Sequence, residues 1–560
     1  MHPVDTDSSS SPAIKGRGDL DTAQDHRNDG EMQLSEKSVG DQAPEEQYPG
    51  KKVVIPIVLS VCLASFLASL DRTIIGVAVP AISNEFNSFA DISWYESGYL
   101  LTFAALQLPM GKIYTFFRTK WVFIATILIF EIGSTISAAA PTSTAFIVDR
   151  TISGVGGAGL TAGSQVVFVD LLPLAKRPKY QGFLGATFGV ASIAGPLLGG
   201  VFASKASWRW CFWINLPIGA VAAAVLLVML PPKPPPRTQN AGETFWQRLK
   251  QFDPVGTALM LPGLILLLLA LQWGGIEGWT SKRVLACLIL GIALLVAFGA
   301  WQIWAGENGT VPPRIIRQRS IAAAAVTSLG FGSVLIIVTF YVPIWYQAIQ
   351  GLTAVDAGIR MMGYFLSTVV FVIGSGIITS KIGYYTPPLI IGTAIAVVGC
   401  GLLTTLRVDT SSATVIGYQV LTGAGLGLSL IQTVNAAQTV LSREDIPVGI
   451  TLINFGNLVG GTIFVSVCQG VLSGTLTTEL AKIPGGTIDV HALLGSGATD
   501  VRKLLTPDQL PAFLAAYNKG IDNIFYVALA AALLAFVASL FLEGKSVKKA
   551  QPQQETVAVV

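Results

Sequence analysis

The chain has 560 residues, of which 52% are hydrophobic and only 12% are charged. A soluble globular protein carries about 25% charged residues, so this composition excludes an ordinary cytosolic enzyme, a nucleic-acid-binding protein and a disordered regulator. The net charge of +3 is unevenly distributed, because residues 1–50 hold 11 Asp and Glu against 4 Lys and Arg. That segment's net charge of −7 leaves +10 for the rest, and loop charges that orient membrane helices explain this excess without a nucleic-acid partner.

Cysteine and histidine give no sign of a disulfide framework or a metal site. The five cysteines are scattered singly through apolar runs, and His2, His26 and His491 lie outside those runs. The sequence has no CxxC or Cys/His cluster and no visible nucleophile–base pair. We therefore expect no metal, no catalytic residues and no cofactor. Any proton chemistry inside the bilayer has to use carboxylates or water.

Fourteen apolar runs are long enough to cross a bilayer, which takes a helix of about 20 residues. They predict an all-α integral membrane protein with fourteen transmembrane helices. The expected spans are 54–79, 92–114, 121–140, 144–169, 180–203, 209–230, 254–273, 284–304, 321–345, 357–380, 387–406, 413–438, 448–472 and 521–542.

The basic residues of the short loops predict the orientation. With the amino terminus in the cytosol, the inner connections hold fifteen Lys and Arg and the outer short loops hold five. Positive charge concentrates on the cytosolic side of membrane proteins. Both termini are therefore expected in the cytosol, since the number of spans is even.

Polar stretches divide the chain into segments. Residues 1–50 predict a disordered cytosolic tail, because no basic stretch precedes an apolar one as in a signal peptide. The other expected segments are an amino-terminal six-helix bundle (51–230), a proline-rich cytosolic linker (231–253), two inserted helices (254–304), a carboxyl-terminal six-helix bundle (305–545) and a cytosolic tail (546–560). Within the second bundle, 473–520 predicts an outer loop with a short helix around Pro511 to Tyr517.

A short internal repeat supports two equivalent halves. Gly154 of span four recurs as Gly423 of span twelve, an offset of 269 residues, and Gly111 at the end of span two recurs as Gly376 at an offset of 265. Parallel halves with a substrate path between them are a known transporter architecture.

Span one contains the charged pair Asp71-Arg72 within an apolar run that continues to Pro80. Charges inside a membrane helix cost a few kcal/mol each on insertion scales, so they survive mainly by facing a cavity or each other. Asp71 then either binds a proton or orients substrate, or it belongs to a structural ion pair or an interfacial anchor.

Span four carries Arg150 and the glycine run 154–159. The run fits the dinucleotide pattern GxGxxG, but that motif needs a preceding strand. Close packing of membrane helices at Gly154 is the better interpretation. Arg150 keeps its charge, and a fixed cation controls proton binding by a nearby carboxylate. Glu131 of span three is one partner for it, and a static ion pair is the alternative.

Span five ends in Gly195-Pro196-Leu197-Leu198-Gly199-Gly200. Proline removes a backbone donor and bends a helix, and glycines permit close contact with a neighbouring helix. The motif predicts either a bent helix that moves between the two halves or a simple packing kink.

These residues resemble the major facilitator superfamily, and within it the fourteen-span drug:proton antiporters of fungi. Leu70-Asp71-Arg72-Thr73 is similar to that group's span-one signature, and Gly195 to Gly200 to its span-five antiporter motif. The string from Trp208 to Gly219 resembles the opening of span six in the fungal members. The loop after span two departs from the superfamily pattern, since Thr115 stands where an Asp is usual and Arg118 where a second Gly is usual.

The resemblance implies a proton-driven exporter of small hydrophobic toxins, drugs or secondary metabolites, acting as a monomer in the plasma membrane, with the vacuolar membrane as the alternative. It implies Asp71 as the proton-responsive group, Arg150 as the charge that controls it and Glu131 as second choice, while Arg72, Gln165 and Gln432 could line the substrate path. A proton-coupled importer or siderophore-type carrier keeps the same fold and reverses the flux. A transport-inactive sensor that signals through its tails is a third hypothesis.

Overall fold

The computed structural model describes residues 48–88, 91–236, 251–480 and 510–548. The predicted terminal tails and the predicted linker lie largely outside these residues, as does most of the predicted outer loop. Within the described part the chain is helical, with one isolated β-bridge between Tyr384 and Ser546. An all-helical chain is what lipid requires, because a helix satisfies its own backbone hydrogen bonds.

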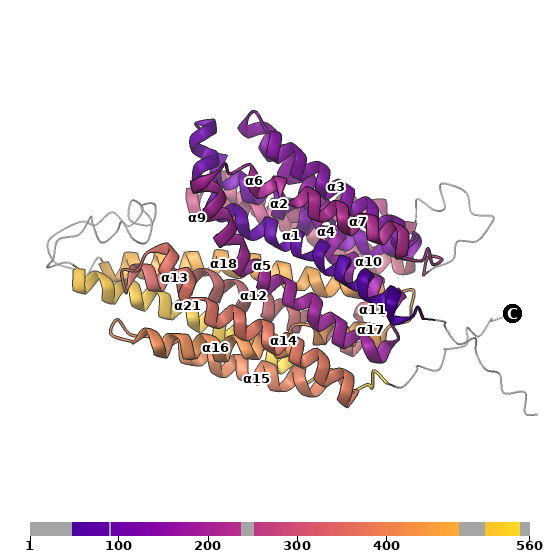
Figure 1. Cartoon of the computed structure of the whole chain (residues 1–560). Coiled ribbons are helices and arrows are strands. Elements are labelled where there is room, and N and C mark those ends of the chain that lie inside the picture. The colour runs from indigo at the N-terminus through magenta and orange to yellow at the C-terminus, as the bar shows by residue number, and fades with distance from the viewer. Residues whose placement is uncertain (1–47, 89–90, 237–250, 481–509, 549–560) are drawn as a thin grey trace, which may run out of the picture. The chain divides into compact units, whose positions relative to one another are not determined.

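The first half contains six long helical segments (Figure 1). These are α1 (Lys51–Phe86), α2 (Ile92–Phe116), α3 (Thr119–Ala139), α4 (Ser143–Leu171), α5 (Arg177–Lys205), and the short α6 (Trp210–Trp213) followed by α7 (Asn215–Met229). Two further helices, α9 (Pro254–Glu277) and α10 (Lys282–Ala305), follow the linker.

The second half repeats the pattern. It contains α11 (Pro313–Ile316), α12 (Arg319–Ala348), α13 (Ala354–Arg360), α14 (Met362–Ile382), α15 (Thr386–Leu403), α16 (Ser412–Ser429), α17 (Gln432–Val440), α18 (Ile446–Leu480) and α21 (Leu510–Ser539). Every predicted span coincides with a helix or with two consecutive helices. Both α18 and α21 extend into the segment 473–520 that the sequence assigns to a loop, and the short helix expected around Pro511 to Tyr517 is the start of α21.

Thirteen helices among the described residues are long and apolar enough to cross a membrane. The remaining predicted span corresponds to α2, which has 25 residues but whose apolar character is diluted by Glu96, Gln107 and Lys112. The length of α2 matches that of its neighbours, so the fourteen-helix arrangement expected from the sequence stands.

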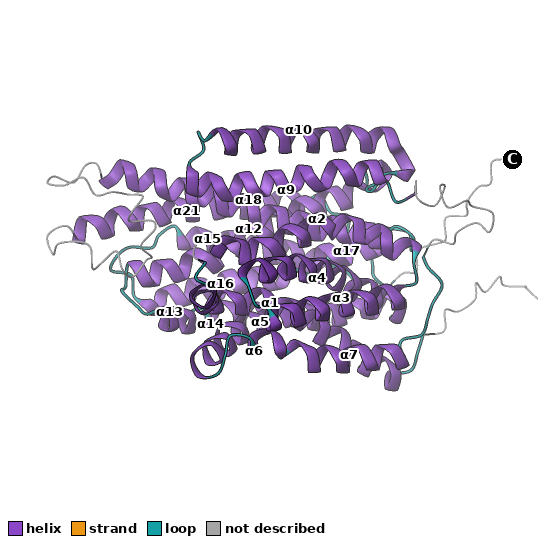
Figure 2. Cartoon of the chain, turned by 90° about the horizontal axis from the view of Figure 1, so that it is seen from above, coloured by secondary structure: helices purple, strands orange, loops and turns teal. Residues whose placement is uncertain are grey.

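Helix contacts confirm the two bundles and the inserted pair. In the first half α1 packs on α5 and α7, and α4 packs on α2 and α3. In the second half α12 packs on α18 and α21, and α16 packs on α14 and α15, so each contact has its counterpart. The inserted helix α9 packs on α2 and α18, and Figure 2 shows α10 at the margin next to α9.

The two halves meet at two equivalent crossings near the face where α1 begins and α21 ends, hereafter the terminal face. Gly111 of α2 lies against Pro447 and Val448 of α18, and a Cβ added at Gly111 would lie 3.1 Å from the Val448 Cα. Gly376 of α14 lies against Pro178 of α5 in the same way. Gly111 and Gly376 are the glycines of the predicted repeat, which the fold therefore bears out.

Candidate functional site

The first half contains a fully buried ion pair between α1 and α4. Arg150 donates from Nη1 to Asp71 Oδ1 at 3.0 Å and to Oδ2 at 2.8 Å, and the two side chains are 1% and 0% exposed. The sequence singles out both residues but leaves open which carboxylate faces Arg150. The structure brings Arg150 to Asp71, while Glu131 has no hydrogen-bond partner.

Aromatic rings and one carbonyl complete the surroundings of Arg150. Its Nε donates to the Tyr95 carbonyl at 3.1 Å, and its guanidinium carbon lies 4.8 Å from the Tyr99 ring centroid and 5.8 Å from that of Phe212. A cation on an aromatic face gains about 2 kcal/mol or more when it is desolvated. Desolvating both charges costs several kcal/mol per ion, so the pair persists only because these partners hold the guanidinium in place.

Asp149, the neighbour of Arg150 in the sequence, faces α3 rather than the ion pair. Its Oδ1 accepts a hydrogen bond from Ser153 at 3.2 Å, and its Oδ2 accepts one from Ser137. Asp149 is buried, and the hydrogen bonds of its carboxylate come from hydroxyl groups. A buried acid with hydroxyl partners is a second polar site in the same bundle.

Two charged residues of α1 and α2 lie beside this pair. Arg72 is half-buried, and its guanidinium carbon lies 5.3 Å from the Phe103 ring centroid. Glu96 of α2 interacts electrostatically with both Arg72 and Arg150. Glu96 is not among the site residues predicted from the sequence, although an acid one turn into a membrane span is a detectable signal.

The start of the segment from Trp208 to Gly219 forms a cluster of hydrogen bonds, hereafter the clamp, that joins it to the ends of α1 and α3. This cluster lies at the face opposite the terminal face. Glu85, at the end of α1, accepts hydrogen bonds from Trp208 Nε1 at 2.6 Å and from Arg209 Nη2 at 2.8 Å. Arg209 also donates to the Ala140 carbonyl at 2.9 Å. Phe146 packs edge-on to both Trp208 and Phe212. The clamp thereby fixes Phe212, the ring that covers Arg150.

The predicted glycine motifs are contact surfaces between helices. Gly195 and Gly199 of α5 lie against Thr73 and Ile74 of α1, directly after the charged pair of that helix. The helix α5 is continuous through Pro196 and Gly200 to Lys205. The glycines of α5 that face the other half come earlier, at 182, 185 and 189, where they contact α14.

The glycine run of α4 lies inside that helix, as expected for packing rather than for nucleotide binding. A Cβ added at Gly154 would overlap the Thr102 hydroxyl of α2, and one added at Gly156 would lie 2.6 Å from the Phe130 nitrogen of α3. These positions let α2 and α3 approach α4 closely.

Gln165 and Gln432 lie toward the terminal face, in the last third of their spans. Gln165 Oε1 accepts a hydrogen bond from Asn454 of α18 at 3.3 Å, so it joins the two halves. Gln432 is fully buried, and its Oε1 accepts hydrogen bonds from Thr379 at 3.1 Å and Asn435 at 3.0 Å.

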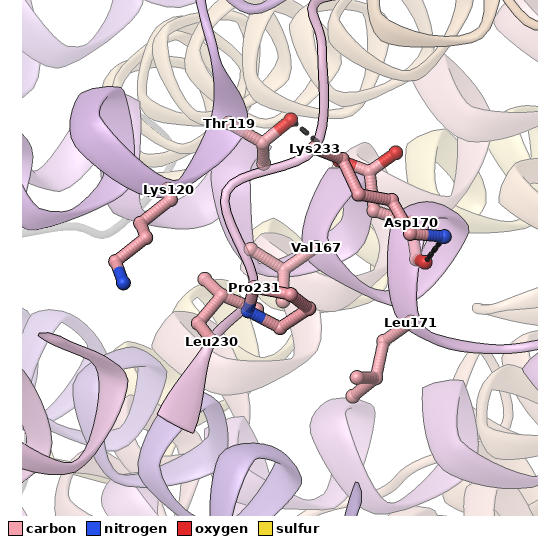
Figure 3. Close-up of a pocket in the computed structure, with 8 residues that line it drawn as sticks. All are labelled: Thr119, Lys120, Val167, Asp170, Leu171, Leu230, Pro231 and Lys233. Atoms are coloured by element: carbon pink, nitrogen blue, oxygen red, sulfur yellow. Dashed lines mark hydrogen bonds between the residues drawn. The ribbon is translucent and has the colours of Figure 1, made fainter. Parts of the chain in front are cut away.

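The end of α4 forms a polar junction at the terminal face. Asp170 Oδ2 accepts a hydrogen bond from Thr119 at 2.6 Å, and its carbonyl accepts one from Lys233 at 2.6 Å (Figure 3). These residues line a small pocket with Lys120 and Leu230. Within the described residues, no group of three or more His, Cys, Asp or Glu is placed to hold a metal ion.

Comparisons with known proteins agree with this geometry. The family model of the Major Facilitator Superfamily matches residues 61–465. The chain is 43% identical to the MFS-type transporter VdtG of Byssochlamys spectabilis over 91% of each chain. It is 44% identical to the MFS-type efflux pump MFS1 of Trichophyton rubrum, over 89% of this chain and 92% of that one. It is 42% identical to the rubrofusarin-specific efflux pump aurT of Gibberella zeae, over 90% and 92%.

A solved structure has the same fold. The proton:xylose symporter XylE bound to 6-bromo-6-deoxy-D-glucose matches 89% of this chain and 98% of its own, with a TM-score of 0.57 at 14% identity. The chain therefore belongs to the Major Facilitator Superfamily and is a multi-pass membrane transporter rather than an enzyme.

Proposed function

We propose that this protein exports small hydrophobic molecules, such as secondary metabolites or toxins, in exchange for protons. The observation that carries the proposal is the buried Asp71–Arg150 pair. An acid and a fixed cation inside a membrane bundle are typical of proton pathways. The names of the relatives MFS1 and aurT as efflux pumps support the outward direction.

Proton binding would be coupled to movement of the helices because separating Asp71 from Arg150 costs free energy. Protonation of Asp71 would remove the counter-charge of a buried guanidinium, and an uncompensated buried charge costs about 3–5 kcal/mol. Arg150 would then have to move toward other partners, and α1 and α4 would move with it. Because α1 packs on α5 and α5 packs on α14 of the other half, such a shift reaches the interface between the halves.

The crossings between the two halves indicate which side of the membrane is open in this conformation. With the terminal face in the cytosol, the crossings of Gly111 with α18 and of Gly376 with α5 close the cytosolic side. The conformation then faces outward, and alternating access consists of opening these crossings while the opposite ends of the two bundles close. The protein would act as a monomer in the plasma membrane, with the proton gradient as its energy source and no cofactor.

Inside-out plasma-membrane vesicles from yeast cells that express the chain test the proposal. We expect uptake of the hydrophobic dye rhodamine 6G when the vesicle lumen is acidic, and loss of that uptake when an uncoupler collapses the pH gradient. Vesicles without the protein are the control. Dye movement out of the vesicles would indicate an importer, and uptake that is indifferent to the uncoupler would contradict proton coupling.

A further inference from the structure

Glu131 of α3 stands apart from the other acids of the first half. Both of its carboxyl oxygens are buried, and neither has a hydrogen-bond partner. Asp71, by contrast, receives both Nη1 bonds of Arg150, and Asp149 receives two hydroxyl bonds. Glu131 is therefore the acid of this bundle whose surroundings offer nothing to stabilise a negative charge.

The Glu131 carboxyl group occupies the space that a side chain at position 219 of α7 would fill. The carboxyl group lies against Gly219, where an added Cβ would lie 2.5 Å from the Glu131 Cδ and would overlap Oε1. Any larger residue at 219 would displace the acid. The space beside Gly219 thus has the size of one carboxyl group.

The charged groups on the neighbouring helices do not supply a cation. On α4, Arg150 is engaged by Asp71 and Asp149 by the Ser137 and Ser153 hydroxyls. On α1, Asp71 interacts electrostatically with Glu131 and repels its charge. On α7, one turn before Gly219, the Asn215 amide donates to Ser134 of α3 at 3.1 Å.

A carboxylate in such surroundings is unfavourable by many kcal/mol, and a buried acid without a partner becomes neutral instead. We propose that Glu131 is a second proton-binding site, loaded in this conformation and emptied in the other. In the outward-facing state Glu131 is a carboxylic acid, whose proton came from the outer water before α3 closed on α7. When the halves rearrange and α3 separates from α7, water reaches the group and the proton leaves to the cytosolic side. The inference rests on the proposed proton exchange and adds one proton to each cycle.

Infrared spectroscopy of the purified chain in nanodiscs tests this inference without any substrate. A carboxylic acid has a C=O stretching band, whereas a carboxylate has COO⁻ stretching bands at lower frequency. The spectrum of the protein minus that of Glu131→Gln therefore shows the protonation state of this group. At neutral pH we expect Glu131→Gln to remove one carboxylic-acid band. The control Glu307→Gln, an exposed acid paired with Arg314, should remove a carboxylate band instead.

Gly219→Ala provides a second test in which the acid is retained. We expect this variant to displace the carboxyl group and to convert its band to the carboxylate form, whereas Gly299→Ala, at a helix position with open space, should leave the band unchanged. A difference spectrum of Glu131→Gln that shows a lost carboxylate band would overturn the inference and leave the proposed function intact. Failure of the proposed function would show instead as uncoupler-insensitive dye transport, whatever the spectrum.

Discussion

Asp170, at the last turn of α4, and Arg443, in the connection before α18, form an ion pair of 3.4 Å between the two halves at the terminal face. Thr115 of α2 donates to the Glu444 carbonyl beside it at 3.4 Å. Thr115 occupies the position where the superfamily usually has an acid. In this chain the acid of the ion pair between the halves is instead Asp170 of α4. The pair is partly exposed, which limits its strength to about 0–1 kcal/mol.

Removal of this charge should loosen the closed terminal face. We expect Arg443→Ala to raise the open fraction by up to about fivefold, which corresponds to about 1 kcal/mol, whereas Arg443→Lys should change it little. The measurement is the rate at which a thiol reagent modifies a cysteine placed at Thr451, which is buried against Gly111. Equal rates in the alanine variant and the parent protein would show that the pair does not hold the halves together.

At the crossing of Gly376 with α5, the neighbouring helix leaves no room for a side chain. A Cβ at Gly376 would lie 3.2 Å from the Gly182 Cα and would overlap the Pro178 carbonyl. We expect Gly376→Val to prevent closure of the terminal face and to reduce transport of rhodamine 6G at least tenfold. Gly374, on the same helix, has open space beside it. Full transport by Gly376→Val, or equal loss in Gly374→Val, would contradict the assignment of this crossing.

Asp253 fastens the inserted helices at the terminal face. Its carboxylate accepts hydrogen bonds from Trp301 Nε1 and Gln302 Nε2 at 2.7 Å and from the Thr310 nitrogen at 2.8 Å. Asp253 also caps α9 with a left-handed φ of 50°, a backbone conformation that Asn tolerates better than Ala. Each buried donor left unsatisfied costs about 1–3 kcal/mol, so Asp253→Ala should lower the melting temperature far more than Asp253→Asn.

The pH dependence of stability follows from the same contacts. Burial by itself raises the pKa of Asp253, but the hydrogen bonds from Gln302, Trp301, Gly256 and Thr310 outweigh it, and the pKa in the folded protein is lowered. The stabilisation is therefore present above the unfolded pKa of about 3.9 and is lost as the pH falls through the lower folded value. Thermal unfolding between pH 7 and pH 3 should show this loss in the parent protein. A parallel loss in Asp253→Ala would assign it to other groups.

Composition and apolar run length predict the helical membrane fold because each span is a local feature of the sequence. Asp71 and Arg150 could likewise be identified one by one, since charged residues in apolar runs are costly. Their pairing could not, because they are 79 residues apart and meet only through the packing of α1 on α4. Even the glycine repeat, which indicates two halves, does not show that Gly111 and Gly376 are where the halves touch.

Other structural features depend on contacts between distant residues, which no local sequence pattern predicts. The hydrogen bonds of Asp253 come from residues up to 57 positions away, and its left-handed backbone has no signature in the sequence. The sequence ends the thirteenth span at 472 and begins the last one at 521 because the stretch between them is polar, although α18 continues to Leu480 and α21 begins at Leu510. Glu96 could be identified from the sequence in the same way as Asp71, since it is an acid within an apolar span.

The most direct test of the account is transport by Asp71→Asn in proteoliposomes with an imposed pH gradient. Asparagine keeps the shape of the side chain but cannot carry a proton, so we expect rhodamine 6G transport to lose its response to the gradient while the protein remains folded in the membrane. The parent protein in the same liposomes should accelerate transport when the gradient is imposed. Gradient-driven transport by Asp71→Asn at the parent rate would contradict the claim that this acid couples proton movement to export.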